Sequence, residues 1–410
     1  MSRKVVITGM GCVSGLGVGT AENWRRTCRG ESAIRLLERE APADHPAWGF
    51  SGPAAWIDQN ACIAALEGKD LRPLGRLDPL STYALVATGE AVEDAGLAGH
   101  PALLDRTAIV LGCGSGGNTT IDAAYERLYA RGSGKVHPQT IPASMMSAPA
   151  SHVAMLLGAH GPAFVLASAC ASSAHAIGEA MHMVRGGRVD VAVAGGSEAC
   201  LNLGSWVAWN SLGVLAPDTC RPFSSGRKGM VLGEGAGVLV LESEEHALSR
   251  GAAILGELAG YGASSDASDM TAPDQAGIEA AIRAAHRDAG VDPTLPVLIS
   301  SHGTGTRLND PVEAAAMRAV YGAALDRHMV IATKSAHGHL IGGTGAVEFI
   351  IGMKALAEGI APPVLNHLGI DPECDLPLAL EPAAIDHDVL VSNSFAFGGL
   401  NAVLIGRKYA

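Results

Sequence analysis

One cysteine, Cys170, stands in a stretch whose pattern suits covalent chemistry. In "VLASACASSAHAIGEAM", residues 165–181, a short apolar run ends in small residues and a helical pattern begins. Free backbone N–H groups and the dipole at a helix N-terminus stabilise a thiolate. The small neighbours leave room for an acyl chain. The same local pattern also fits a buried structural cysteine, a metal ligand or half of a disulfide, so four interpretations remain open at this level.

Histidines follow two other strand patterns, far along the chain. His302 enters a Gly/Thr turn in "ISSHGTGTRLNDPVEAAA", at the strand end where α/β sites tend to lie, although a hydrogen-bonded turn histidine is the simpler alternative. The segment "ATKSAHGHLIGGTGAVE" carries Lys334, His337 and His339. Its His-x-His pair suggests a metal, but no carboxylate or third histidine has ligand-like local spacing. We therefore predict no metal site.

Glycine-rich segments are the third feature. In "NSFAFGGLN", Phe395 and Phe397 precede two glycines, which permit unusual backbone angles and expose N–H groups. An ordinary β-turn with two core aromatics is the alternative. The segment "VVITGMGCVSGLGVG" lacks the G-x-G-x-x-G spacing of dinucleotide sites, and "GEGAGVLVLE" leads into a strand rather than a helix. Neither predicts a nucleotide cofactor.

The elements that must position these residues alternate between strand and helix. Nine short Val- and Ile-rich runs, such as "TAIVLGC" and "VDVAVAGG", recur along the chain. Ala-rich helical stretches lie between many of them, at residues 81–95, 174–185, 276–289 and 311–321, which predicts an α/β fold. Residues 163–187 and 329–359 both read as strand, turn and helix, which indicates a duplicated architecture. We place the boundary near 250–256, giving an N-terminal half of residues 1–252 and a C-terminal half of residues 253–410 that share one core.

Composition limits the class of protein. Of 410 residues, 48% are hydrophobic and 17% charged, as in a globular protein. A net charge of −12 argues against broad nucleic-acid binding. No apolar run reaches the roughly 18 residues of a membrane helix. The eight cysteines are scattered without a C-x-x-C pair, which predicts free thiols and a cytoplasmic location.

Taken together, the motifs resemble those of the β-ketoacyl-acyl-carrier-protein synthases, especially the type II elongating enzymes of the thiolase superfamily. The resemblance covers essentially the whole chain, in order. Its segments are "VVITGMG", "ACASSAHAIGEA", "VAGGSEA", "RPFSSGRKGMVLGEGAGVLVLE", "HGTGTRLND", "KSAHGHLIGGTGAVE" and "NSFAFGGLN". It implies a five-layered αβαβα sandwich of two similar halves, normally a homodimer.

The resemblance implies a Cys–His–His site of Cys170, His302 and His339, with Lys334 as an active-site lysine and Glu348 as its charged partner. It selects the nucleophile among the four interpretations of Cys170. An acyl group would transfer to the Cys170 thiolate, and the histidines, mainly as neutral N–H donors, would stabilise the enolate formed when malonyl-carrier protein loses carbon dioxide.

Further roles are implied at neighbouring positions. The backbone N–H groups of Cys170 and Phe397 would form the oxyanion hole. Thr304 and Thr306 would bind the phosphopantetheine arm, and Phe395 and Phe397 would gate the acyl chain. No metal or redox cofactor is implied, because the carrier thioester supplies the activation.

Four positions depart from the family pattern. His337 stands where Thr is frequent, and Ala396 and Leu400 replace the usual Gly and Thr. Ala396 is expected to stiffen the gating turn. Ser115 stands where elongating enzymes often have a bulky aliphatic residue at the end of the acyl pocket, which suggests a longer or functionalised chain. These departures favour a specialised synthase of a polyketide, polyene or nodulation-signal pathway over housekeeping fatty-acid synthesis.

Carrier proteins are acidic, so a local basic patch is expected. Lys69, Arg72 and Arg76 lie in the region where the family docks its carrier, although any one of them also fits a solvated surface charge. Possible additions are Arg221, Arg227 and Lys228.

Related classes are distinguished by their site residues. Thiolases use a second cysteine, and chalcone-synthase types pair Cys and His with Asn, whereas here the third position is His339. Non-catalytic chain-length subunits typically lack the nucleophilic cysteine, which is present here. The sequence leaves open an active subunit that works only beside an inactive, chain-length-factor-like partner.

Overall fold

Two five-stranded sheets form the framework of the molecule. The computed structural model describes residues 3–41, 45, 48–101 and 106–409. The N-terminal sheet has the order β6 (Ala163–Leu166), β5 (Thr107–Gly112), β7 (Val191–Glu198), β9 (Gly235–Ser243) and β1 (Val5–Ser14). The C-terminal sheet has the order β12 (Met329–Ile331), β11 (Leu298–Ser300), β15 (Val389–Ala396), β16 (Leu400–Arg407) and β10 (Gly256–Ser265). Each order runs third, second, fourth, fifth, first when the strands are counted along the chain.

The two sheets are joined at their inner edges. Strand β1 pairs with β10 through Val6 with Glu257 and Ile7 with Gly256. With the short β2 (Gly17–Val18) beside β1, the result is a continuous 11-stranded sheet. The repeated strand order confirms that the chain consists of two similar halves. The predicted division after residue 252 falls between α9 (Glu244–Ser249) and β10, and it stays a prediction.

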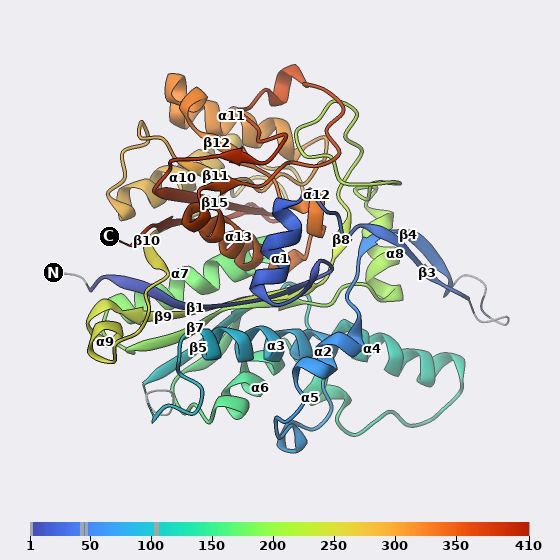
Figure 1. Ribbon diagram of the computed structural model, residues 1–410. Coiled ribbons are helices and arrows are strands. Elements are labelled where there is room, and N and C mark those ends of the chain that lie inside the picture. The colour runs from blue at the N-terminus through green and yellow to red at the C-terminus, as the bar shows by residue number, and fades with distance from the viewer. Residues whose placement is uncertain (1–2, 42–44, 46–47, 102–105, 410) are drawn as a thin grey trace.

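Helices cover both faces of each sheet (Figure 1). Helices α3 (Pro79–Asp94) and α6 (Ala148–Leu157) lie on the outer face of the N-terminal sheet, and α10 (Gln275–Ala289) and α11 (Asn309–Tyr321) lie on the outer face of the C-terminal sheet. Helices α7 (Ser172–Arg185) and α13 (Thr344–Glu358) pack against each other between the sheets. These layers confirm the predicted αβαβα sandwich.

Most strands away from the sheet edges are rich in apolar residues because helices cover both faces of the sheets. In β7, Ala192 and Ala194 face the central core around α7 and α13. The alternate residues Val191 and Val193 face the outer core around α3 and α6. Helices predicted near residues 81–95, 174–185, 276–289 and 311–321 are observed within two residues of those bounds.

A close approach of α7 to β5 fixes the start of the central helix. At Gly112, the last residue of β5, an added Cβ would lie 2.3 Å from the backbone carbon of Ser172 and the backbone nitrogen of Ser173. Only glycine therefore lets the first turn of α7 sit on the strand end. This contact sets the position of the segment that carries Cys170.

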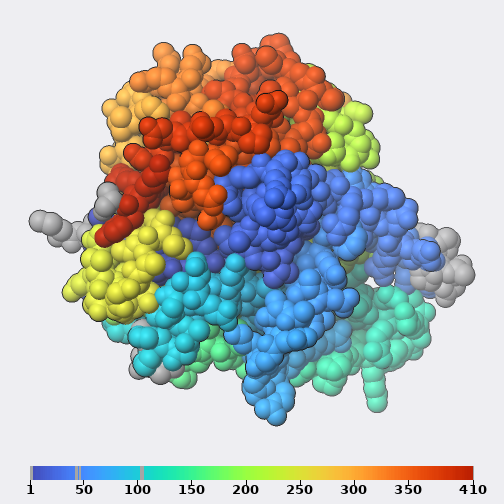
Figure 2. Space-filling view, in the orientation of Figure 1, coloured from blue at the N-terminus to red at the C-terminus, as the bar shows by residue number. Residues whose placement is uncertain are grey.

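The two halves also share a surface joint. Helix α1 (Thr20–Cys28) packs against α13 of the other half. Figure 2 shows this blue N-terminal segment seated against the orange C-terminal half. Among the described residues, no helix is long and apolar enough to cross a membrane.

We predict that Gly112→Ala lowers both stability and Cys170 reactivity. The methyl group forces α7 away from β5, and such overpacking costs about 1–3 kcal/mol. Thermal unfolding and mass-detected iodoacetamide labelling of Cys170 measure the two effects. Gly89→Ala is the control, because Gly89 lies in α3 with open space around its Cα, and alanine in a helix interior is favoured by about 0.5–1 kcal/mol. Unchanged labelling and unfolding in Gly112→Ala would contradict this role.

Candidate active site

Cys170 lies on a sharp turn between β6 and α7. It belongs to the 3-10 turn η5 (Ala169–Ala171), which precedes the helix, and Ala169 adopts a left-handed φ of 47°. Ser172 braces the turn, because its Oγ accepts from the N–H of Ser168 at 2.9 Å and donates to the carbonyl of Ala169 at 2.7 Å. Strained backbone of this kind persists only where the surroundings hold it, and it often marks active sites.

A cavity of about 540 Å³ opens onto Cys170. His302 and His339 line the same cavity, together with Phe395, Phe397 and both predicted threonines. The structure therefore brings together one residue from the N-terminal half and two from the C-terminal half. They are 132 and 169 residues beyond Cys170 in the sequence.

Burial dominates the ionisation of Cys170. The residue is 6% exposed, and burial raises the pKa of its thiol to about 11. The charge of Lys334 and the backbone N–H groups of Phe397 and Cys170 oppose that rise. The backbone N–H groups lower the pKa, as expected for a helix N-terminus, but in the free protein desolvation outweighs them. At neutral pH the group is a thiol.

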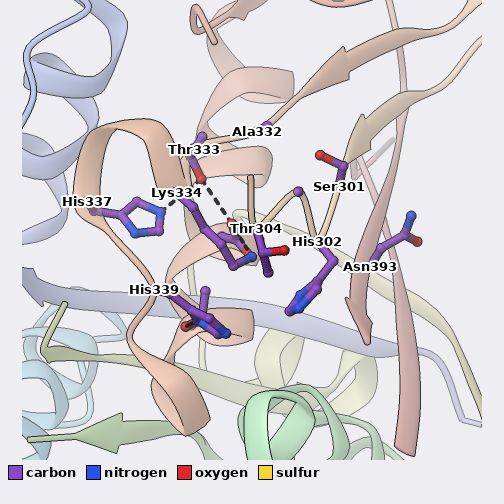
Figure 3. Close-up of polar contacts among 12 residues, drawn as sticks. Ser301, His302, Thr304, Ala332, Thr333, Lys334, His337, His339 and Asn393 are labelled. Carbon is purple, nitrogen blue, oxygen red and sulfur yellow. Dashed lines mark hydrogen bonds and ion pairs between the residues drawn. The ribbon is translucent and has the colours of Figure 1, made fainter. Parts of the chain in front are cut away.

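His302 is the first of the two histidines that line the cavity. Burial, and secondly the charge of Lys334, lowers the pKa of its imidazole well below the usual value, so the ring is neutral. Its Nδ1 is buried without a hydrogen-bond partner among the described residues. The ring packs against that of His339 at 5.5 Å between centroids, with an interplanar angle of 84° (Figure 3).

The tautomer of His339 is set by its backbone. The N–H of Ile341 donates to its Nδ1 at 3.2 Å, so that nitrogen carries the lone pair and Nε2 carries the proton. Thr344 lies 2.9 Å from the same Nδ1. Nε2 is buried and has no partner among the described residues. Since burial and then Lys334 lower the pKa of this imidazole well below its usual value, His339 presents a neutral N–H donor.

Lys334 lies close to these rings. Its Nζ donates to the two carboxylate oxygens of Glu348 at 2.7 and 2.9 Å, and both side chains are buried. Burial raises the pKa of the Glu348 carboxyl to about 7, and Lys334 opposes that rise. Removing one partner of a buried pair typically costs about 3–5 kcal/mol, so the pair holds the Lys334 ammonium in a fixed place.

His337 supports this pair without lining the cavity. Its Nδ1 donates to the carbonyl of Gly338 at 2.8 Å, so Nε2 accepts from the hydroxyl of Thr333 at 2.9 Å (Figure 3). Burial lowers the pKa of its imidazole to about 3. Thr333 also lies 3.5 Å from Glu348. His337 is therefore a neutral, hydrogen-bonded side chain close to Lys334, and its effect on the site stays a prediction.

The other residues predicted to bind the substrate do not all lie in the cavity. Thr304 and Thr306 line the cavity with their hydroxyls 2.9 Å apart. Phe395 is 4% exposed and packs on the ring of His302, whereas Phe397 is half-buried at the mouth. Ser115 does not line this cavity, and its hydroxyl donates to the buried Glu198 at 2.7 Å. Its expected contact with an acyl chain stays a prediction.

Two of the other departures lie at the gating turn. Ala396 lines the cavity, and it pairs across the strands with Leu400. Their effect on gating stays a prediction.

The predicted docking cations lie away from the cavity lining. Lys69 is paired with Glu93 at 2.8 Å and Arg72 with Asp70 at 2.8 Å, whereas Arg76 has no ion pair among the described residues. Of the three possible additions, Arg221 is paired with Asp218 and Arg227 is buried in a pair with Asp371, and Lys228 lines the cavity mouth. Arg227 is thus unavailable to a partner.

Sequence reasoning missed several residues of the site. Glu313 accepts from the backbone N–H groups of His302 and Gly303 at 2.7 and 2.8 Å and so fixes the His302 backbone. The signal was a lone carboxylate in the otherwise apolar stretch "PVEAAA". Arg307 and Trp209 line the mouth, and they carried no motif that could have identified them. Among the described residues, no three His, Cys, Asp or Glu side chains are grouped as metal ligands.

Comparison with known proteins agrees with this geometry. The family described as "Beta-ketoacyl synthase, N-terminal domain" matches residues 2–247, and its C-terminal domain matches residues 255–367. The chain belongs to the β-ketoacyl synthase family. It is therefore a ketosynthase, an acyltransferase of the thiolase fold.

The relatives of this ketosynthase include proteins with several different names. Nodulation protein E of Rhizobium leguminosarum bv. trifolii is 41% identical over 410 residues, covering 100% of both chains. 3-oxoacyl-[acyl-carrier-protein] synthase 2 of Staphylococcus aureus (strain COL) is 34% identical over 426 residues, covering 100% of this chain and 99% of the relative. The solved ishigamide ketosynthase/chain length factor is 33% identical, with a TM-score of 0.92 and full coverage of both chains.

Proposed function

We propose that this ketosynthase condenses an acyl thioester with malonyl-acyl-carrier protein, with Cys170 as the acyl carrier during the reaction. The observation that carries the assignment is the cavity in which the Cys170 thiol faces two neutral imidazoles and the backbone N–H of Phe397. A nucleophile, a donor for an enolate and a donor for an oxyanion are the three parts that this chemistry needs.

Loading is the first half of the reaction. The sulfur of Cys170 attacks the acyl carbonyl, and the carrier leaves as a thiol that receives the cysteine proton. His302 is the neighbouring imidazole able to pass that proton, because no described group fixes its tautomer. The lone pair of His339 is already occupied by the N–H of Ile341. In the condensation that follows, the N–H groups of Cys170 and Phe397 hold the oxyanion that forms on the acyl carbonyl.

Decarboxylation and condensation form the second half. The bond between the malonyl carboxylate and its α-carbon breaks, carbon dioxide leaves, and the electron pair forms an enolate. The Nε2–H of His339 donates to the enolate oxygen, with His302 as the second imidazole. The enolate carbon then attacks the thioester on Cys170, and the carbon–sulfur bond breaks with its electron pair on sulfur. The Cys170 thiolate takes up a proton from solvent, and a β-ketoacyl thioester remains on the carrier. The chemistry needs no metal or redox cofactor.

We predict that substitution of His339 and substitution of His302 affect the two half-reactions differently. His339→Ala removes only a donor, so it should lower malonyl decarboxylation by about 10²–10³-fold and leave acyl loading of Cys170 within a few-fold. His302→Ala should slow both steps, because it also removes the proton relay. Loading is followed by intact mass and decarboxylation by release of carbon dioxide. An equal fall of loading in both variants would contradict these roles.

The cavity mouth is suited to a phosphodiester. Lys228 and Arg307 are exposed there, and no Asp or Glu is among the residues that line the cavity, although the whole chain carries a net charge of −12. Neither cation has an ion-pair partner among the described residues. Lysine and arginine are the usual ligands of phosphate. We propose that they bind the phosphate of the phosphopantetheine arm, with Thr304 and Thr306 deeper along the same arm.

Charge reversal tests where the carrier binds. Lys228→Glu with Arg307→Glu should raise KM for acyl-carrier protein at least about tenfold, because two attractions to a phosphate become repulsions. Arg72→Glu with Arg76→Glu tests the docking region that the resemblance implies. This double substitution should also raise KM for acyl-carrier protein. The acyl thioester of N-acetylcysteamine, which has no phosphate, should react normally with both variants. If a double variant loses as much activity with this small thioester as with acyl-carrier protein, the binding role proposed for its two residues is refuted.

We further propose a specialised pathway and a two-chain assembly. Nodulation protein E is more similar (41%) than the 3-oxoacyl-[acyl-carrier-protein] synthase 2 relative (34%), which favours a specialised substrate.

Among the described strands, β6 lies at an edge of the sheet, and several exposed apolar side chains belong to the segment 125–164. They are Tyr125, Tyr129, Ile141, Met145, Met146, Met155 and Phe164. A second copy of this chain, or a chain-length-factor-like homologue, would cover them. All eight cysteines are free, which supports a cytoplasmic location.

A further inference from the structure

Trp209 connects the gate of the cavity to the protein core. It lies in the last turn of α8 (Leu203–Ser211), is half-buried, and lines the same cavity as Cys170. Its ring contacts the ring of Phe397 at 6.0 Å between centroids, with planes 30° apart. Centroid distances of 4.5–7 Å are those of attractive aromatic pairs.

The other side of Trp209 rests on a fixed cluster. This cluster contains Trp206, Met230 and Ile341, all buried, and Trp209 packs against it. Ile341 is the residue whose N–H sets the tautomer of His339. The indole of Trp209 therefore packs on this buried cluster on its core side and on Phe397 on its cavity side.

Phe397 itself stands on a turn that is held at its backbone. The N–H of Gly398 donates to the carbonyl of Met270 at 2.8 Å, and the carbonyl of Gly399 accepts from Asp266 at 2.9 Å. Both glycines have positive φ, at 80° and 67°. These two bonds hold Gly398 and Gly399, and within the described chain Trp209 is the aromatic ring that contacts the ring of Phe397.

We propose that Trp209 is a positioning residue that clamps Phe397 in the closed state and so keeps its backbone N–H directed at Cys170. The inference rests on the proposed function and extends it to a residue outside the family motifs. Entry of an acyl chain must break the contact between the two rings, and its re-formation restores the oxyanion donor for condensation. The contact between Trp209 and Phe397 thus couples closure of the cavity mouth to the placement of the Phe397 N–H in the oxyanion hole.

The test compares two rates in the full-length protein. Trp209→Leu keeps apolar packing on the cluster but removes the ring. With octanoyl-N-acetylcysteamine as the probe, loading of Cys170 should stay equal or become faster, because the mouth opens more readily. Condensation with malonyl-carrier protein should fall about tenfold or more, since removing an oxyanion donor altogether costs about 10²–10³. Trp209→Phe retains an aromatic ring and should recover most of the condensation rate.

Controls separate the clamp from a general structural role. Val207→Ala, at an exposed position of the same helix, should change neither rate. Trp209→Met replaces the Leu variant if thermal unfolding shows that the latter is not folded. Loading and condensation that fall together, or a condensation rate equal to that of the wild type, would overturn the clamp. Failure of the wild-type protein to load would instead overturn the proposed function.

Discussion

Desolvation of the reacting groups is the constraint on which the rest of the structure depends. Cys170, His302 and His339 are each almost fully buried, and burial is the largest influence on the pKa of all three. It keeps the thiol protonated and both imidazoles neutral. A site of neutral groups suits a reaction in which charge develops only on the enolate and the oxyanion, where the fixed N–H donors and the field of Lys334 act without solvent screening.

The duplicated fold supplies these groups from both halves. Cys170 follows β6 in the N-terminal sheet, whereas His302 follows β11 and His339 follows β12 in the C-terminal sheet. The two sheets join at β1 and β10, and α7 and α13 pack between them, so the strand ends from both halves meet at one cavity. The close seat of α7 on Gly112 places the nucleophile, and the Lys334–Glu348 pair fixes the charge behind the histidines.

Much of this arrangement could be predicted from the sequence, and the misses have physical causes. Nine of the ten main strands carry continuous apolar runs, and these were recognised. Eight of the nine are largely buried, whereas the edge strand β6 is exposed or half-buried along its length. The tenth, β10, was missed because glycines replace apolar residues there. At Gly262 a Cβ would lie 2.3 Å from the backbone of α10, so close helix packing excludes the usual pattern. The residues of the motifs were identified through the resemblance. The protonation state of the Cys170 thiol could not be predicted, because it depends on the depth of burial, which the sequence does not show, as well as on the helix N-terminus, which it does. Trp209 was missed because its contact with Phe397 joins segments far apart in the chain, and Arg307 because no motif surrounds it. Glu313 acts on the nearby backbone of His302, and only its place in an apolar stretch marked it.

Intact-mass analysis of the protein incubated with a panel of acyl-carrier proteins tests the central claim most directly. The account predicts that one acyl group adds to the wild-type chain, that peptide mapping places it on Cys170, and that Cys170→Ala gains no mass. The chain that adds most readily also reports the substrate. An acyl adduct that persists in Cys170→Ala, or no adduct with any carrier while malonyl-carrier protein is still decarboxylated, would contradict the assignment of Cys170 as the acyl-bearing nucleophile.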